Sequence, residues 1–429
     1  MHVLASAPSD AALEMLRSAV DFSACACQTG DQAVPDVVMQ DADKSCLPPS
    51  CRAVPAQRPS SWPVCSPRVL RQIPSRYQVR GSLGRGAYSS VLSAVDSCTQ
   101  EYVAIKCLKN VFSDSKEARR ALREIKLLKH FSGSPNILPL QEVISPSSFD
   151  TFHDLLMVLK QMDGDLRELL TLMPGAVPVR LRQTLAFTIL EGLQEIHSAN
   201  VVHRDLRPKN ILIKGNRAVI CDFGMGRSVG LQLSLLAVTS LSDYMAPEGL
   251  LGASKYTSAV DVWSFGCIVA ELISGRPIFA ARSRHDRLRL ILSVTGLPSD
   301  EDAEFVEKYK YAVELQAAIA SLPRTIDPRK NLARMLPDAT PAELDLLQAI
   351  FVFNPTKRVT AAGALDMPVF AGRERTGKLF APFTYSDLHY DKMRNAAAAV
   401  KEAMYEEVTG TKAAPACPPG PARGPLPSL

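Results

Sequence analysis

Three short segments after residue 76 have the apolar, β-branched composition that is typical of β-strands. They are residues 77–83, 90–96 and 102–108, and a glycine-rich turn separates the first two. By contrast, residues 1–75 are rich in Ala, Ser, Pro and Cys and show no sustained period. We therefore predict a disordered tail there. Residues 11–22 are weakly amphipathic and suit either a helix or a docking segment.

Helical spacing follows the third strand. Asp114, with Glu117 three residues later, is a typical helix start. A longer helix is predicted after Pro178, and short strands follow it. The apolar positions that mark the first helix are Ala118, Ala121, Leu122, Ile125 and Leu128, and the later strands are expected at 201–202, 211–213 and 218–220.

The chain therefore begins with strands and continues mostly as helix to about residue 408. Residues 415–429 are rich in proline and have no reason to fold. This order predicts an α+β fold with two lobes. A length of 429 residues is sufficient for two packed lobes with tails.

Composition excludes several classes of protein. Hydrophobic residues make up 46% and charged residues 22%, which is ordinary for a soluble globular protein. The net charge of +5 is small, so nucleic acid is not an expected partner. Apolar runs are too short to span a membrane, and the N-terminus resembles no signal or transit peptide. A cytoplasmic or nuclear location follows. The ten cysteines match no common zinc spacing and are expected to be free thiols.

Two glycines stand between the first two strands, at Gly84 and Gly86. A loop without side chains at these positions can fold closely over phosphate groups, although any hairpin may use glycine. Val91, just beyond, can form an apolar roof for an adenine ring. Lys106 places an ammonium group in an otherwise apolar strand, where a lysine usually extends to the surface. A functional role requires an anionic partner, and Glu124 on the next helix can supply it.

The most specific signal is His203-Arg-Asp205-Leu-Arg207-Pro-Lys-Asn210, followed by Asp222-Phe-Gly224. Asp205 can orient a substrate hydroxyl, and Asn210 and Asp222 can ligate Mg²⁺ through oxygen. One Asp or Asn in a loop is usually a turn former or a helix cap. Chance does not readily produce this ordered set together with Ala246-Pro-Glu248.

On these motifs the chain resembles the eukaryotic protein kinase family over residues 77–370. The resemblance implies a small β-rich N-lobe with a five-stranded sheet and one helix, a larger helical C-lobe, and ATP with Mg²⁺ between them. Lys106 would then hold the α- and β-phosphates. The residues that it assigns to the nucleotide site are Leu83, Gly84, Gly86, Val91, Ala104, Lys106, Leu159 as gatekeeper, Lys160, Met162 and Cys221.

The resemblance also sets expected boundaries and structural residues. Asp261-Val-Trp263 matches the helix that braces the catalytic loop, and Arg358 matches the partner of Glu248. We assign that pair to stability. The expected segments are a tail at 1–75, an N-lobe at 76–160, a C-lobe at 161–370, an extension packing on the kinase domain at 371–410 and a tail at 411–429.

Within the family, the C-lobe is most similar to the mitogen-activated protein kinases, with cyclin-dependent kinases next. Gly275-Arg-Pro-Ile-Phe279 and residues 295–302 follow the segment with the insert that those groups share. Residues 390–408 resemble the extension that returns to the N-lobe.

Four features of the sequence, one residue and three segments, differ from that group. Arg207 replaces a lysine, which keeps the positive charge but changes its shape. Residues 222–248 contain no Thr-x-Tyr. Ser242-Asp-Tyr-Met245 replaces an Arg-Trp-Tyr-Arg that shapes the site for the residue after the phosphoacceptor. Residues 371–378, at the acidic docking position, are net basic. Arg204 could pair with a phosphate on one of four hydroxyls, at Ser234, Thr239, Ser240 or Ser242.

The leading hypothesis is a serine/threonine protein kinase with Asp205, Arg207, Lys106 and Glu124 as catalytic residues and Asn210 and Asp222 as metal ligands. Its expected partners are protein substrates and an upstream kinase or docking protein. The alternative is a nucleotide-binding pseudokinase that acts as a signalling scaffold, because the activation segment and Arg207 are atypical. A small-molecule kinase on the same fold is a third, weaker alternative.

Overall fold

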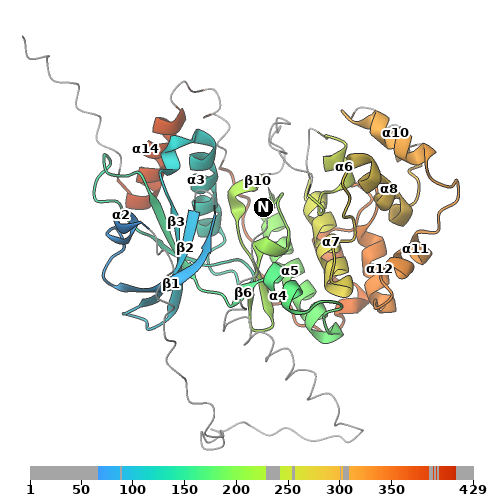
Figure 1. Cartoon of the computed structure of the whole chain (residues 1–429), viewed down its shortest axis with the longest axis horizontal. Helices are drawn as coiled ribbons and strands as arrows, with labels where there is room; N and C mark the ends of the chain where they lie inside the picture. The colour runs from blue at the N-terminus through green and yellow to red at the C-terminus, as the bar shows by residue number, and fades with distance from the viewer. Residues whose placement is uncertain are drawn as a thin grey trace, which may run out of the picture.

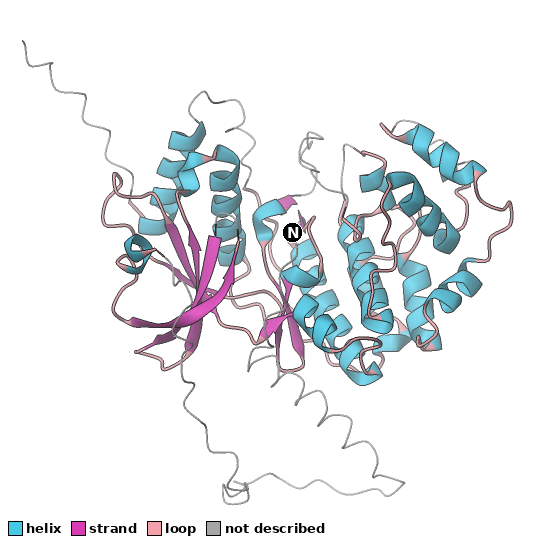
Figure 2. Cartoon of the chain, viewed as in Figure 1, coloured by secondary structure: helices cyan, strands magenta, loops and turns pink. Residues whose placement is uncertain are grey.

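The computed structural model describes residues 66–86, 89–228, 242–253, 257–299, 301–302, 309–385, 390, 393 and 396–411. These residues form one lobe built on a β-sheet and a second lobe built almost entirely of helices (Figures 1 and 2). The predicted α+β, two-lobed fold is confirmed. The amphipathic stretch at 11–22 and the proline-rich end at 415–429 lie outside the described residues. Among the described residues, no helix is both long enough and apolar enough to cross a membrane.

The first lobe contains a five-stranded antiparallel sheet in the order β1-β2-β3-β5-β4. The three strands predicted from the sequence are confirmed as β1, β2 and β3. The bounds are β1 Tyr77–Arg85, β2 Ser89–Asp96, β3 Tyr102–Leu108, β4 Leu140–Val143 and β5 Leu155–Lys160.

The two faces of this sheet belong to different hydrophobic clusters. Ala104, Met157 and Leu159 join the large core that continues into the helical lobe. Ile105 and Val158 alternate with them and form a smaller core on the opposite face. Because side chains alternate along a strand, Lys106 shares the face of Ala104. The register therefore aims the lysine toward the second lobe.

The smaller core is closed by a helix that precedes the expected boundary at residue 75. Helix α2 (Pro67–Leu70) buries Val69, which is 1% exposed, against this face. The expectation of one helix in this lobe thus omitted α2. Its four residues are too few to show a helical period.

Helix α3 (Ser115–His130) covers the other face and carries Glu124. Asp114 caps it as predicted by accepting a hydrogen bond from the Lys116 backbone at 2.7 Å. Helix α14 (Ala396–Thr409) lies against α3 (Figure 1). Glu407 of α14 accepts hydrogen bonds from the side chains of Lys126 and Lys129 on α3. The C-terminal segment is thus attached to the helix that positions Glu124.

The helical lobe is built around α5 (Val179–Ser198) and α7 (Ala259–Ser274). The hairpin of β8 (Ile211–Lys214) and β9 (Arg217–Ile220) packs on α5, where Ala218 N–H donates to Thr188 Oγ1 at 3.0 Å. The predicted long helix and the three short strands are present, as α5, β7, β8 and β9. The bounds are β6 Gly164–Asp165, α4 Leu166–Leu172, α5 Val179–Ser198, β7 Val201–Val202, β8 Ile211–Lys214, β9 Arg217–Ile220, β10 Arg227–Ser228, α6 Pro247–Leu250, α7 Ala259–Ser274, α8 Arg284–Thr295, α10 Ala312–Ala320, α11 Pro328–Met335, α12 Pro341–Ile350 and α13 Ala361–Leu365.

Residues 376–378, in the net basic segment, are held against α5 by their backbone. Glu191 accepts hydrogen bonds from the N–H groups of Thr376 and Gly377, at 2.5 and 2.9 Å. Glu195 accepts one from Lys378 N–H at 3.0 Å. Both carboxylates are 1% exposed, so these amides provide the hydrogen bonds that a buried charge requires.

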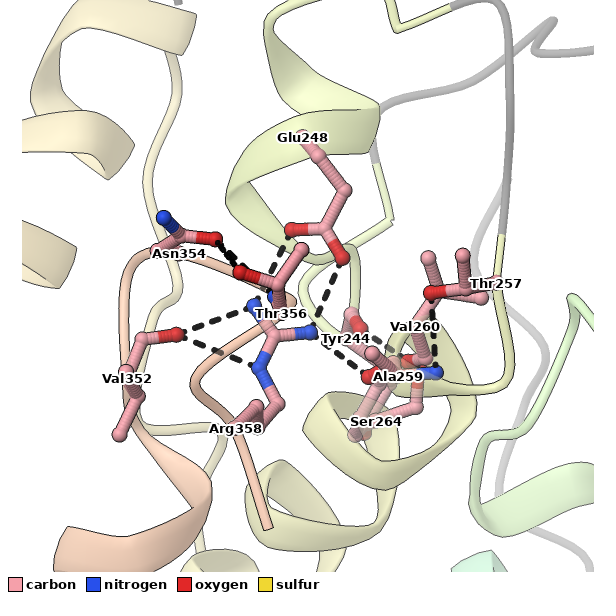
Figure 3. A network of polar contacts seen from close by, with 10 residues as sticks. All are labelled: Tyr244, Glu248, Thr257, Ala259, Val260, Ser264, Val352, Asn354, Thr356 and Arg358. Atoms are coloured by element: carbon pink, nitrogen blue, oxygen red, sulfur yellow. Dashed lines mark hydrogen bonds and ion pairs between the residues drawn. The ribbon is translucent and has the colours of Figure 1, made fainter. Parts of the chain in front are cut away.

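A buried ion pair joins α6 to the segment after α12 (Figure 3). The Arg358 guanidinium donates to both oxygens of Glu248, at 2.9 and 3.1 Å, and also to the carbonyls of Val352 and Ala259. Arg358 is 5% exposed and Glu248 is 4% exposed. The pair lies outside the lining of the cavity described below, in agreement with the structural role expected for it.

Replacing Arg358 with methionine should lower the free energy of unfolding by about 3–5 kcal/mol, because the Glu248 charge would stay buried without its partner. Urea denaturation measures this change. The matched control is Arg375→Met, which breaks an exposed pair with Asp366 and should cost only about 0–1 kcal/mol. Equal losses in the two variants would contradict the assignment.

Candidate active site

Strand β3 and helix α3 bring Lys106 and Glu124 together. The Lys106 Nζ atom lies 2.7 and 2.8 Å from the two carboxylate oxygens of Glu124. Burial alone would lower the pKa of Lys106, but the negative charges of Glu124 and Asp222 outweigh it and hold that pKa above its ordinary value. The lysine is therefore a fixed positive charge, and the glutamate determines its position.

The catalytic loop is held in place by a buried carboxylate of α7. Asp261 accepts hydrogen bonds from the backbone N–H groups of His203 and Arg204, both at 2.8 Å, and contacts His197 Nε2 at 3.1 Å. Burial opposes its ionisation, but the hydrogen bond and charge of His197 lower the Asp261 pKa below its usual value. Arg204 has a φ of 70°, which is uncommon for a residue with a side chain. The ionised Asp261 stabilises this turn.

Asp205 and Asn210 face each other across the loop. The Asn210 amide nitrogen donates to the Asp205 carbonyl at 2.7 Å and to its Oδ2 at 3.0 Å. Because that nitrogen faces Asp205, the Asn210 amide oxygen is the atom that can serve as a metal ligand. Burial raises the pKa of Asp205 above its ordinary value, although Arg207 and His203 favour the charged form.

Asp222 stands in a left-handed conformation at the start of the Asp-Phe-Gly turn, with a φ of 63°. Its side chain accepts a hydrogen bond from Gly224 N–H at 3.3 Å. Phe223 is fully buried, with its ring 5.1 Å from that of His203 and 5.6 Å from that of Phe131. Burial raises the pKa of Asp222, but the charges of Lys106 and His203 lower it below its usual value. The turn thus presents an ionised carboxylate beside Lys106.

Arg207 lies where the resemblance led us to expect a lysine. Its Nε atom is 3.4 Å from Asp205 Oδ2, and its side chain is 43% exposed. The guanidinium therefore stays beside the Asp205 carboxylate and lines the cavity described next.

A cavity of about 660 Å³ joins these groups. Five of the predicted site residues line it: Lys106, Glu124, Asp205, Arg207 and Asp222. The predicted metal ligand Asn210 is buried beside Asp205 and is not part of the lining. The cavity continues along the N-terminal half of α3 and also reaches the segment from Ser242 to Ala246. A concave site that presents Lys106 and Arg207 suits an anionic group such as a phosphate.

The residues expected around adenine occupy the neighbouring part of the sheet and do not line this cavity. Val91 pairs with Lys106 and Ala104 pairs with Leu159, so all four lie on the lobe-facing side. Leu159 is 5% exposed and Ala104 is 9% exposed, whereas Leu83 is 48% exposed and Met162 is partly buried.

Gly84 pairs with Val91 at the end of β1, and a Cβ atom there would meet nothing within 4 Å. At Gly86 a Cβ atom would lie 2.8 Å from Ser89 Oγ. A side chain at Gly86 would require the Ser89 hydroxyl to turn away, whereas Gly84 has open space at its Cβ position.

Two further sets of residues bear on this site, the described cysteines and the side chains that could bind a metal ion. Cys221 is buried before Asp222, and burial raises the pKa of its thiol well above the ordinary value, so it is unreactive. The four described cysteines form no disulfide bond with one another. In the described part of the chain, no group of three or more His, Cys, Asp and Glu side chains could hold a metal ion. Asn210 and Asp222 fit Mg²⁺, which characteristically uses few protein ligands together with phosphate oxygens.

Two contacts beside this site have no signal in the spacing of residues along the chain. Arg287 of α8 contacts Asp243, and Arg167 of α4 contacts both Tyr244 and Glu271. Arg167 and Arg287 come from helices far away in the chain. An arginine in an amphipathic helix normally faces solvent, so its sequence position carries no signal of burial.

The comparisons with known proteins agree with this geometry. The protein kinase domain model matches residues 77–370. Mitogen-activated protein kinase 3 of Oryza sativa subsp. japonica is 39% identical over 305 residues, which cover 70% of this chain and 80% of the rice protein. Mitogen-activated protein kinase 14 of Arabidopsis thaliana is 37% identical over 306 residues, covering 71% of this chain and 82% of that protein. The chain therefore belongs to the eukaryotic protein kinase superfamily and is a serine/threonine kinase of the mitogen-activated protein kinase-like group.

Proposed function

We propose that this protein transfers the γ-phosphate of MgATP to serine or threonine side chains of protein substrates. The observation that supports this most strongly is the shared cavity, where the Lys106–Glu124 ion pair meets Asp205 and Asp222. Phosphoryl transfer requires a positioned nucleotide, neutralised phosphate oxygens and an aligned hydroxyl group. Each requirement has a group in this cavity.

The nucleotide is held from the sheet side. Gly84 and Gly86 allow the strand turn to approach the phosphates, and Lys106 binds the α- and β-phosphates in the orientation that Glu124 fixes. The adenine ring lies among Leu83, Val91, Ala104, Leu159 and Met162, with backbone groups of Lys160 and Met162 available to its edge. Cys221 forms part of the apolar floor.

Asn210 and Asp222 would hold Mg²⁺ through oxygen atoms, and the ion would supply positive charge against the phosphate oxygens. Asp205 accepts a hydrogen bond from the substrate hydroxyl, aims it at the phosphorus and takes up its proton. Arg207, beside Asp205, supplies positive charge on the side of the transferred group. The guanidinium group of Arg207 is bulkier than the ammonium group of a lysine. We therefore expect a slower reaction than a lysine at this position would give.

Regulation must differ from that of the similar kinases. Residues 222–248 contain no Thr-x-Tyr, and most of the hydroxyls that could replace it lie outside the described residues. We propose that an upstream kinase acting here would modify a single serine or threonine, with Arg204 as a partner for the phosphate. The net basic segment at 371–378 would favour a docking partner that is not basic.

Purified protein mixed with MgATP and a generic substrate protein should transfer phosphate, and the Asp222→Asn variant should not. The variant removes one charged metal ligand while keeping its size. Radiolabel incorporation measures both proteins. Equal residual signal would contradict catalysis, and a nucleotide-dependent rise in melting temperature without transfer would support the pseudokinase alternative.

Lys106→Met should lower kcat/KM by about a hundredfold or more, because the phosphates lose a preorganised charge at the reacting centre. Steady-state kinetics measure the loss, and a melting curve checks the fold. The matched control is Lys214→Met. Lys214 lies on the β8–β9 hairpin, its side chain is 55% exposed, and it pairs with Asp163. Insoluble or unfolded Lys106→Met protein would contradict a purely catalytic role.

A further inference from the structure

The segment at residues 66–76 precedes the residues that match the protein kinase domain model, which begin at residue 77. It lies against the face of the sheet that carries the smaller hydrophobic core. Val69 of α2 is buried there, and Leu70 and Ile73 pack on the same cluster. Figure 1 shows α2 beside the strands of this lobe. The segment is therefore a folded part of the first lobe that the family model does not include.

One buried carboxylate, that of Asp154, binds side chains of this segment. Its Oδ2 atom accepts a hydrogen bond from Gln72 Nε2 at 2.9 Å and lies 3.3 Å from Arg68 Nε. The Asp154 side chain is 3% exposed, whereas that of Arg68 is 51% exposed. A buried carboxylate needs such donors, because it has lost most of its contact with water. The segment thus fixes the orientation of Asp154.

The other oxygen of Asp154 binds the backbone that connects β3 to α3. Its Oδ1 atom accepts a hydrogen bond from Asn110 N–H at 2.9 Å. Asn110 has a φ of 45°, a left-handed conformation that asparagine adopts more readily than most residues. The next residue, Val111, donates its N–H to the His153 carbonyl at 3.0 Å. The turn between β3 and α3 is thus attached to the two residues that precede β5.

This turn lies between the two partners of the catalytic ion pair. Asn110 stands four positions after Lys106 in the sequence, and the helix that begins at Ser115 carries Glu124. Asn110 also lines the same cavity as the ion pair. A displacement of the turn would move the start of α3 relative to β3, and the 2.7 Å contact between Lys106 Nζ and Glu124 would change with it.

Helix α14 supports the same connection from another side. The Phe112 ring packs on that of Phe152, with centroids 4.9 Å apart, and Phe152 lies 6.1 Å from the ring of Tyr405 on α14. Lys401 Nζ lies 5.8 Å from the centroid of the Phe112 ring. These ring contacts reach the connection without passing through α2. Changes in residues 66–76 therefore test the contribution of Asp154 separately.

We propose, on the basis of the proposed function, that Asp154 is a positioning residue through which residues 66–76 set the position of Glu124. The two donors of that segment hold one oxygen of the carboxylate, which leaves the other oxygen aimed at Asn110 N–H. When the donors are lost, the carboxylate turns away and the β3–α3 turn loses its fixed acceptor. A segment outside the kinase domain model thereby contributes to the rate of phosphoryl transfer.

The first test uses the full chain with Arg68→Gln and Gln72→Leu combined, because both residues lie outside the lining of the catalytic cavity. Hydrogen exchange at Asn110 N–H should be about tenfold or more faster than in wild type, since its acceptor is no longer held. Mass spectrometry of peptides that cover Asn110 measures it. The matched control is Arg71→Gln, an exposed arginine of the same segment. Unchanged exchange in the double variant, or equally faster exchange in the control, overturns the proposal.

The second test separates a positioning role from a structural one. Asp154→Ala should lower kcat/KM by about tenfold in the otherwise wild-type chain, but by less than about twofold when Glu124→Gln is already present. An effect that passes through Glu124 disappears once that side chain no longer forms an ion pair with Lys106. Asp154→Asn keeps an oxygen for Asn110 N–H and should recover about threefold or more of the loss. Equal losses from Asp154→Ala in the two backgrounds overturn the positioning role.

The two proposals fail separately, because hydrogen exchange requires no phosphoryl transfer. A wild-type chain that transfers no phosphate contradicts the proposed function, while the exchange comparison still decides whether residues 66–76 hold the turn. An active chain whose kcat/KM changes by less than about twofold in the double variant supports the proposed function and overturns the positioning role. Melting curves check every variant. If Asp154→Ala is unfolded at the assay temperature, the double variant takes its place in the comparison with Glu124→Gln.

Discussion

The arrangement of the active site depends on one buried carboxylate, Asp261. It is fully enclosed in the helical lobe, yet the backbone of His203 and Arg204 donates to it from the catalytic loop. Without that acceptor, the two N–H groups would be unsatisfied, at a cost of about 1–3 kcal/mol each. The left-handed backbone at Arg204 would also lose its support. Asp205 and Asn210 follow directly in the chain, so their positions are set by a side chain that lies outside the catalytic cavity.

The position of Glu124 depends on the contacts of helix α3. This helix brings Glu124 to Lys106, and its other contacts decide where the glutamate lies. Glu407 of α14 binds two lysines of α3, and Phe131 at the end of α3 packs against Phe223 of the Asp-Phe-Gly turn. Lys106 in one lobe and the Asp-Phe-Gly turn in the other therefore both contact this helix or the residue at its end. Lys126 and Glu407, which are 281 residues apart in the sequence, thus form one of the contacts that hold α3 in place.

The sequence predicted the strands, the long helices and the cluster of charged residues because each has a local signature. Lys106 in an apolar strand and Asp205 five residues before Asn210 are examples, and the structure brings Lys106, Asp205 and Asp222 to one cavity. The missed features have no such signature. Helix α2 is too short to show a period, and the burial of Arg287 depends on carbonyl groups of residues 279 and 281 and on Asp243. Tertiary contacts of that kind cannot be read from spacing along the chain.

The attachment of residues 376–378 has a consequence for how this surface can evolve. Glu191 and Glu195 bind main-chain N–H groups, which every residue except proline possesses. Substitutions that change the charge of this segment can therefore accumulate while the segment keeps its place. Gly377 is the exception, because a Cβ atom there would lie 3.2 Å from Glu195 Oε1. A surface built in this way can change its charge through point substitutions, with the underlying fold unchanged.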